Sequence, residues 1–347
     1  MRENLWRVAI AGLVGIGIVG CGDRQGNEAG SGNSGAGAVS GAGGNVGGPM
    51  AGATWTRRGK QANWAAAASS ADGTKLVAVA TNYEAGLDVY TSGDSGVTWN
   101  QTGLARFWSS VASSADGTKL VAVEHGTWDP FCACYQGGYI YTSADSGATW
   151  IQHGVLQRWS SLASAADGTK LVAVSDGDHI YTSWDSGATW IQRGTLQKWS
   201  SVASSADGAK LVAVAGGDYI YTSADSGATW TQNGSQHGWM SVASSADGTR
   251  LVAVASTDYI YTSADSGVTW TQSESTHIFT TSTSLASSAD GTKLVAATAN
   301  DYIYTSADSG VTWTQSGSQQ DWSSVASSAD GTKLVAVVWY GYIYTWP

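Results

Sequence analysis

"WSSVASSADGAKLVAVAGGDYIYTSADSGATWTQ", residues 199–232, is one copy of a unit that the sequence repeats seven times. Every copy contains an Ala-Asp-Gly turn, and successive turn aspartates are 44, 51, 40, 40, 43 and 40 residues apart. Repeats of about 40 residues that are made of short strands indicate the blades of a β-propeller. The turn aspartates are Asp72, Asp116, Asp167, Asp207, Asp247, Asp290 and Asp330.

Four short strands can be recognised within this unit. Residues 210–215, "KLVAVA", form a continuous apolar run, which is typical of a strand covered on both faces by neighbouring sheets. Residues 200–204 are small, residues 219–223 are aromatic and β-branched, and residues 228–232 alternate in polarity. The Asp-Gly pair between the first two strands supplies a tight hairpin turn. We therefore expect about four antiparallel strands in each blade.

The octet "SADSGATW", residues 223–230, connects the third and fourth strands. Its pattern S-x-D-x-G-x-T-W resembles the Asp box of the bacterial neuraminidase repeat, and the resemblance covers residues 55–347. It implies a β-propeller. Families built in this way include sialidases, sortilin-type receptors, xyloglucan-degrading hydrolases and the photosystem II assembly factor, so the motif leaves function open. The six octets are residues 92–99, 143–150, 183–190, 223–230, 263–270 and 306–313.

The two ends of the repeat region complement each other. Trp55 precedes Trp64 by nine residues, as the octet residue Trp230 precedes Trp239, whereas the last copy stops at Pro347 without an octet. The sequence thus predicts an all-β, seven-bladed propeller over residues 54–347. Its ring is closed by the N-terminal strand, residues 53–59, which completes the C-terminal blade and leaves no open ring edge.

The residues before the propeller indicate export. An apolar run of 12 residues, 8–19, is too short to span a membrane and ends in "IVGC". This segment resembles a bacterial lipoprotein signal, which implies a signal peptide over residues 1–20 and a lipid on Cys21. Residues 21–53 are rich in Gly and Ser and are expected to form a flexible tether. We expect a lipid-anchored protein of the bacterial cell envelope, at the outer membrane or a periplasm-facing membrane, that touches the membrane through its lipid only.

The charge balance narrows the class of partner. The chain has 17 Lys and Arg against 27 Asp and Glu, a formal net charge of −10. Binding to phosphate backbones needs clustered cations, so nucleic acid is not an expected partner. We expect a monomer without a cofactor.

The hairpins of a propeller blade alternate between two rims. The Ala-Asp-Gly turns and the octets share one rim, called here the repeating rim, and their aspartates are interpreted as turn formers. The loops between second and third strands and the junctions between blades share the other, the variable rim. There, an arc of carboxylates opens the third strands of four blades and forms a candidate ligand site, although Asp at a strand start is also ordinary loop chemistry. The arc is Asp178, Asp218, Asp258 and Asp301.

Two further sets of residues lie toward the variable rim. A tryptophan opens the innermost strand of six blades, with Ser282 in the corresponding place of the seventh, and its repetition favours a packing role over stacking on sugars. The tryptophans are Trp64, Trp108, Trp159, Trp199, Trp239 and Trp322. The histidines show no metal-ligand spacing, so we expect solvated side chains and no metal site. They are His125, His153, His179, His237 and His277.

One insertion, "EHGTWDPFCACYQGG" at residues 124–138, interrupts the repeat on the variable rim. The turn and octet aspartates are 29 residues apart here against 18 in the later copies, and the neighbouring loop at residues 81–90 is longer by 4. Two adjacent long loops predict a pocket. Trp128, Phe131, Tyr135 and Glu84 are its candidate ligand-binding residues. Cys132 and Cys134 permit a strained disulfide, free thiols or an intermolecular bridge.

Catalytic signals are sparse. Sialidases use three arginines, a Tyr and Glu pair and an Arg-Ile-Pro motif; this chain lacks the motif, and its nearest cationic cluster is Arg106, Arg158 and Lys198. A glycoside hydrolase needs two carboxylates about 5 to 10 Å apart. The candidates are Glu84, Asp88, Glu124 and Asp129 on blades 1 and 2 and Asp176 with Asp178 on blade 3, and their spacing singles out no pair. Glu124 and Asp129 are the two that lie in the insertion. The first hypothesis is a binding or scaffolding module for a glycan, peptide or protein. The second is a glycoside hydrolase with its acid and base in the loops of blades 1 to 3.

Overall fold

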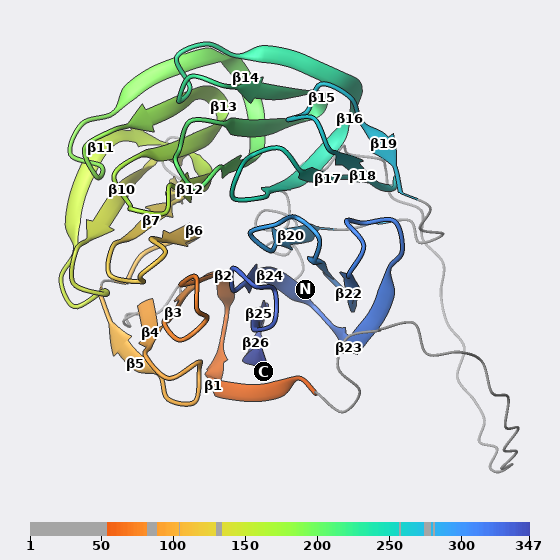
Figure 1. The fold of residues 1–347 in the computed structure, drawn as a ribbon. Helices are drawn as coiled ribbons and strands as arrows, with labels where there is room; N and C mark the ends of the chain where they lie inside the picture. The colour runs from red at the N-terminus through yellow and green to blue at the C-terminus, as the bar shows by residue number, and fades with distance from the viewer. Residues whose placement is uncertain are drawn as a thin grey trace, which may run out of the picture.

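The computed structural model describes residues 54–81, 89–103, 105–129, 134–256, 258–273, 279 and 282–347. These residues form β-sheets arranged in a ring, with the first and last strands side by side (Figure 1). None of them belongs to a helix long and apolar enough to cross a membrane. The structure describes only the backbone of Trp128, Asp129, Cys134 and Tyr135. The candidates Cys21, Glu84, Phe131, Cys132 and His277 lie outside the described residues.

The first two blades each pair four antiparallel strands. The first blade comprises β2 (Trp64–Ser69), β3 (Leu76–Ala80), β4 (Val89–Ser92) and β5 (Asn100–Thr102). The second comprises β6 (Trp108–Ser113), β7 (Leu120–Glu124), β10 (Gly138–Ser143) and β11 (Ile151–Gln157). The insertion between β7 and β10 forms a separate hairpin of β8 (Thr127–Asp129) and β9 (Cys134–Gln136).

In the next three blades some strands run on without a break. β14 and β16 each serve as the outer strand of one blade and the inner strand of the next, which links these blades into one sheet of eight strands. That sheet comprises β12 (Trp159–Ser164), β13 (Leu171–Ser183), β14 (Ile191–Ser204), β15 (Leu211–Ser223), β16 (Thr231–Ser244), β17 (Leu251–Ala255), β18 (Ile260–Ser263) and β19 (Thr271–Gln272).

The last two blades complete the ring. One comprises β20 (Thr283–Ser287), β21 (Leu294–Thr298), β22 (Asp301–Ser306) and β23 (Thr314–Gln320). The other comprises β24 (Trp322–Ser327), β25 (Leu334–Val338), β26 (Gly341–Trp346) and, from the opposite end of the chain, β1 (Thr56–Ala62). Thr56 pairs with Thr345 and Arg58 with Ile343. The predicted closure by the N-terminal strand is therefore confirmed.

A cycle of backbone hydrogen bonds joins the seven Ala-Asp-Gly turns. The N–H of each turn alanine donates to the carbonyl of the alanine in the next blade, at N···O distances of 2.7 to 2.8 Å. Ala329 donates back to Ala71, so the cycle has no end. The residues of the cycle are Ala71, Ala115, Ala166, Ala206, Ala246, Ala289 and Ala329. This ring fixes the spacing of the blades on the repeating rim.

The serines of the inner strands explain why these strands are small and polar. Ser200 Oγ donates to the carbonyl of Val214 in its own blade at 3.0 Å and to that of Trp239 in the next blade at 2.9 Å. Ser161 Oγ accepts the N–H of Val202 in the next blade at 3.3 Å. These serine hydroxyls therefore link the inner strand of one blade to the inner strand of the next.

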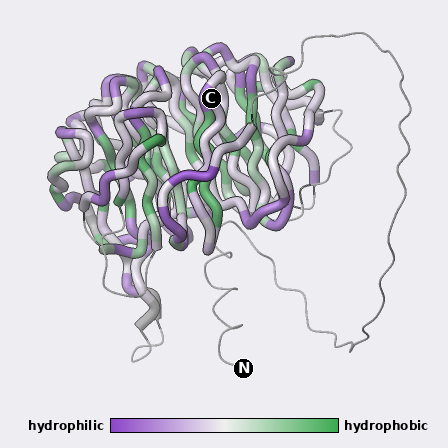
Figure 2. The backbone as a smooth tube through the Cα atoms, turned by 90° about the horizontal axis from the view of Figure 1, so that it is seen from below, coloured by the Kyte–Doolittle hydropathy of each residue, from purple (hydrophilic) through white to green (hydrophobic). Residues whose placement is uncertain are grey.

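The tryptophan ring is packing, as the sequence predicted. All six opening tryptophans are at most 2% exposed, and Trp199 meets Tyr221 edge to face with ring centroids 5.1 Å apart. The seventh place is filled by Phe279 and not by Ser282: Phe279 is 0% exposed and meets Tyr304 edge to face at 5.8 Å. Hydrophobic residues accordingly follow the strands through the body, while hydrophilic residues gather at the turns (Figure 2).

Candidate functional site

The octet turns use their aspartates internally. In residues 223–230, Asp225 Oδ1 accepts the Ser223 hydroxyl at 2.8 Å and the Thr229 N–H at 2.9 Å, and Oδ2 accepts the Thr229 hydroxyl at 2.6 Å. These bonds, the Thr229 hydroxyl first, lower the pKa of Asp225 to about 2. They also hold Ser226 at a φ of 57°, a region that non-glycine residues rarely adopt. Such a carboxylate is part of a turn, as predicted.

The Ala-Asp-Gly turns follow the same principle. Asp207 Oδ1 accepts the Ser205 hydroxyl at 2.6 Å and the Ala209 N–H at 2.9 Å, and the pKa of Asp207 is lowered, chiefly by the Ser205 hydroxyl. Lys170 of the preceding blade donates to the Asp207 carbonyl at 3.0 Å. The repeated pattern of residues on this rim therefore builds turns and joins blades.

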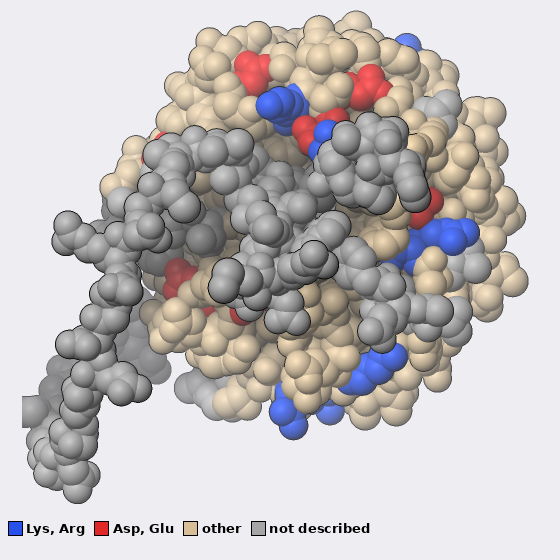
Figure 3. Space-filling model, turned by 180° about the vertical axis from the view of Figure 1, so that it is seen from behind, with Lys and Arg blue, Asp and Glu red and all other residues tan. Residues whose placement is uncertain are grey.

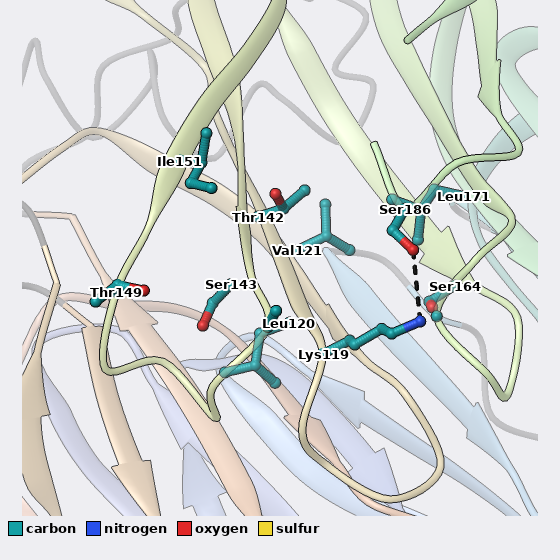
Figure 4. Close-up of a pocket in the computed structure, with 12 residues that line it drawn as sticks. Lys119, Leu120, Val121, Thr142, Ser143, Thr149, Ile151, Ser164, Leu171 and Ser186 are labelled. Carbon is teal, nitrogen blue, oxygen red and sulfur yellow. Dashed lines mark hydrogen bonds between the residues drawn. The ribbon is translucent and has the colours of Figure 1, made fainter. Parts of the chain in front are cut away.

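A cleft of about 180 Å³ lies on the repeating rim between the second and third blades (Figure 4). Leu120, Val121 and Leu171 line its apolar part, and Lys119 Nζ lies 3.5 Å from Ser186 Oγ at one side. Ligand pockets usually measure about 300 to 1,000 Å³, so this cleft is small. The sequence predicted a pocket beside the insertion on the opposite rim. The loops expected to form that pocket lie partly outside the described residues.

On the variable rim, the four carboxylates of the arc each bind a tyrosine. In each of the four blades, the hydroxyl of the tyrosine three residues later donates to the aspartate. The O···O distances are 3.0 Å for Asp178–Tyr181, 3.0 Å for Asp218–Tyr221, 3.2 Å for Asp258–Tyr261 and 3.3 Å for Asp301–Tyr304. In Tyr181, Tyr261 and Tyr304, burial and the adjacent aspartate raise the pKa to about 12. The carboxylates of the arc thus orient the tyrosines that pack against the opening tryptophans and Phe279.

Glu124 performs this role in the second blade. Its Oε1 accepts the Tyr141 hydroxyl at 3.3 Å and the Tyr139 N–H at 3.1 Å, and Arg106 Nε lies 3.8 Å from Oε2. Gly138 occupies the position that carries Asp in the next four blades, and a Cβ there would lie only 2.2 Å from Glu124 Cγ. Glu124 is 9% exposed. The structure therefore places this catalytic candidate inside its own blade.

Among the described residues of the variable rim, four carboxylates each lie beside a basic side chain. Besides Arg106 and Glu124, the Arg158 guanidinium lies 2.8 Å from Asp176, and two imidazoles lie beside carboxylates of the arc. The Nδ1···O distances are 2.6 Å for His179–Asp178 and 2.7 Å for His237–Asp258. The paired side chains are 11% to 39% exposed. Acidic and basic side chains are visible next to one another on the face opposite to that of Figure 1 (Figure 3).

These pairs correct one expectation. Arg106 and Arg158, which with Lys198 were only the nearest approach to a sialidase-like cationic cluster, each face a carboxylate of their own. The histidines are not simply solvated: His179 and His237 contact carboxylates, and His125 is 7% exposed. Burial, with a smaller contribution from the Arg158 charge, lowers the pKa of His125 to about 4.

The sequence interpretation missed the residues that connect each blade to the next on this rim. Gln157 donates to the Tyr181 hydroxyl at 3.0 Å, and Gln197 donates to the Tyr221 hydroxyl at 3.3 Å. Arg106 donates to the Tyr141 hydroxyl at 2.9 Å. These residues share one signal, since each lies two positions before an opening tryptophan. Gln occupies that position in Gln157, Gln197 and Gln320, while Arg106 and His237 replace it in two other blades.

The backbone is closely packed at the base of the insertion hairpin, which consists of β8 and β9. Thr127 pairs with Gln136 and Asp129 with Cys134. Gly126 has a φ of 91°, and a Cβ there would lie 1.8 Å from the Gln136 carbonyl oxygen, so only glycine fits. Across the described residues, no group of three or more His, Cys, Asp or Glu side chains could hold a metal ion.

Comparisons with known proteins define the class. No family model and no curated protein matches the chain. Among solved structures, "YCF48 bound to D1 peptide" is similar with a TM-score of 0.62 and 14% identity, over 86% of this chain and 97% of that one. "YCF48 from Cyanidioschyzon merolae" has a TM-score of 0.61 and 14% identity, over 84% and 98%. At this identity the likeness concerns the fold, and the chain is a β-propeller.

Proposed function

We propose that this propeller is a binding or scaffolding module that takes a peptide or protein ligand on its variable rim. One observation carries the proposal: the carboxylates of this rim are paired with guanidinium or imidazole groups that are partly exposed and that differ from blade to blade. On the repeating rim, by contrast, turn and octet aspartates are bonded within their own turns. Functional residues on a rigid scaffold concentrate where sequence varies over constant structure.

A peptide suits this rim better than a glycan. Alternating carboxylates, imidazoles and guanidinium groups offer partners for backbone N–H and C=O groups and for charged side chains. Sugar rings stack on exposed aromatic faces, but the six opening tryptophans are at most 2% exposed and offer none. The similar YCF48 structure contains a D1 peptide, which supports a peptide as the class of ligand. A glycan ligand rests on the sequence alone.

The hydrolase hypothesis gains no support from the described part of the chain. Glu124 uses its carboxylate to bind Tyr139, Tyr141 and Arg106. The side chain of its candidate partner Asp129 lies outside the described part of the structure.

A selection from a random-peptide display library on the purified chain tests the proposal. Peptides that bind the wild type should bind the variant Arg158→Gln, Asp176→Asn at least about tenfold more weakly, because that variant removes one pair of the rim. The control variant Thr229→Ala, on the repeating rim, should bind them unchanged. Peptides that tolerate the first variant and lose affinity for the control would contradict the proposal. Selection of no peptide, with saturable binding on a glycan array, would favour a glycan ligand.

We also propose that Cys21 carries a lipid that holds the propeller at the bacterial cell envelope. The support is the apolar run of residues 8–19 followed by "IVGC". Labelling of cells with a radioactive fatty acid should mark the wild type and not Cys21→Ala. Labelling that persists in this variant would contradict the anchor.

A further inference from the structure

The outer strand of the closing blade has an unusual charge. β1 carries Arg57, Arg58 and Lys60 within four residues, in a chain whose formal net charge is −10. At about 3.4 Å per residue, the three cations lie along about 10 Å of one strand. Figure 3 shows basic side chains together at the lower edge of the body, where Figure 1 places β1.

The other blades provide an internal comparison. The outer strand β23 reads TQSGSQQ and has the same pattern of exposure as β1, which reads TRRGKQA. β5 and β11 contain no Lys or Arg, and the outer segment of β14 contains two cations, Arg193 and Lys198, five residues apart. Cations on an edge strand can deter pairing with other chains. Protection against pairing with other chains does not by itself explain the cations of β1, because β23 has the equivalent outer position in the same ring and carries no charged residue.

The three cations are held in position, and no carboxylate in the described part of the chain neutralises them. Arg57 Cζ lies 4.5 Å from the centroid of the Tyr342 ring, and Lys60 Nζ lies 4.9 Å from that of Tyr90. Arg58 Nε donates to the Thr345 hydroxyl at 3.1 Å. Within the described residues, none of the three lies within 4.0 Å of a carboxylate oxygen. Side chains that are already ordered lose less entropy when a ligand binds.

We infer that β1 is a second docking site, which binds an acidic, extended segment of a partner protein. Charge complementarity selects the acidic side chains. β1 is the edge strand of its sheet, so the stretch from Thr56 to Arg58 also presents backbone groups for pairing, before the bulge that Gly59 makes at a φ of 62°. A membrane fits less well, because basic segments that bind anionic lipid contain about four to eight cations and make no use of strand pairing.

The repeat itself supplies the test variant. Arg57→Gln, Arg58→Ser, Lys60→Ser gives β1 the residues that β23 carries at the same positions, so the ring is expected to close as before. Fluorescence anisotropy would be measured with a labelled ten-residue peptide of alternating Glu and Val. The wild type should bind this peptide with an affinity that falls as salt is raised, and the triple variant should bind about tenfold more weakly. A matched peptide with Gln for Glu should bind no better than the triple variant binds the Glu peptide.

Three controls make the result decisive. Arg193→Asn, which introduces the residue found at the equivalent Asn233, removes an outer-strand cation elsewhere and should leave binding unchanged. A thermal melt should show that the triple variant folds like the wild type. Equal binding of the Glu peptide by wild type and triple variant would overturn the inference. A loss seen only with vesicles of phosphatidylserine and phosphatidylcholine would assign β1 to membranes instead. Variants of the variable rim should not change the binding of the Glu peptide to β1. The experiments can therefore contradict one of the two proposed sites without contradicting the other.

Discussion

The carboxylates on the two rims of this propeller have different kinds of hydrogen-bonding partner. On the repeating rim, Asp225 is bonded to the Ser and Thr of its own octet, and six octets follow this pattern. On the variable rim, Asp258 is bonded to the His237 imidazole and the Tyr261 hydroxyl, which come from different strands. The octet carboxylates thus make the same turn in every copy. The arc carboxylates each bind the tyrosine three residues later, but their imidazole partners differ from blade to blade, and these partners are the groups that the proposal assigns to recognition.

The largest expected effect concerns the buried imidazole of the variable rim. A pKa of about 4 for His125 means that the folded chain holds this group neutral, so its contribution to stability is present above about pH 6.5 and is lost as the pH falls toward 4. The loss should amount to about 2 to 3 kcal/mol. Urea unfolding at pH 7 and pH 4.5 should show it in the wild type but not in His125→Gln. The same pH dependence in both proteins would refute a buried neutral imidazole.

A smaller effect is expected on the repeating rim. Ser223 is 6% exposed and its hydroxyl accepts the buried Gly227 N–H at 2.9 Å. Ser223→Ala should reduce the free energy of unfolding by about 1 to 3 kcal/mol, because that N–H is left without a partner. The control Ser235→Ala, at an exposed position of β16, should change stability by less than about 0.5 kcal/mol. Urea titrations that rank the two variants equally would show that the octet does not stabilise its turn.

The link between an arc carboxylate and its tyrosine can be measured directly. Burial and the Asp178 carboxylate raise the pKa of Tyr181 to about 12, so neutral Tyr181 contributes stability that is present below about pH 10 and lost as the pH rises through 12. Asp178→Asn should lower this pKa toward 10 without reaching it, since burial remains. Absorbance of tyrosinate at 295 nm, with Tyr181→Phe to assign the signal, would follow the change. An unaltered titration would mean that Asp178 does not act on Tyr181.

The smallest expected effect is on the stability of a variable-rim pair. Arg158→Gln with Asp176→Asn removes an ion pair whose side chains are 37% and 25% exposed. Partly exposed pairs contribute about 0 to 1 kcal/mol, so thermal melts of the variant and the wild type should nearly coincide. A loss comparable to that of Ser223→Ala would give this pair a structural role and weaken the contrast between the rims.

The sequence predicted much of the fold because its repeat is internally consistent. The period of the Ala-Asp-Gly turns, the octets and the nine-residue interval at Trp55 were sufficient for the propeller and its closing strand. The sequence did not predict that Phe279 takes the place of the seventh opening tryptophan. Phe279 lies three positions before Ser282, in a segment out of register with the other junctions between blades. The repeat alone cannot show which side chain is packed in the one blade that lacks the repeated tryptophan.

The site was predicted less well, for a physical reason. Asp178 and Tyr181 are three residues apart and would point to opposite faces of a regular strand, but the pairing register shifts between Asp178 and Ile180. No local pattern reveals that His125 is buried or that the Arg158 charge contributes to its lowered pKa. The side chains of Trp128 and Tyr135 and the placement of Glu84 and Phe131 remain predictions of the sequence.

Hydrogen–deuterium exchange with a selected peptide tests the contrast between the rims most directly. If the variable rim is the binding surface, the bound peptide should slow exchange at residues 105–108, 124–126 and 174–179, and leave the turns at residues 72–75 and 205–210 unchanged. Slower exchange confined to the repeating-rim turns would contradict the account.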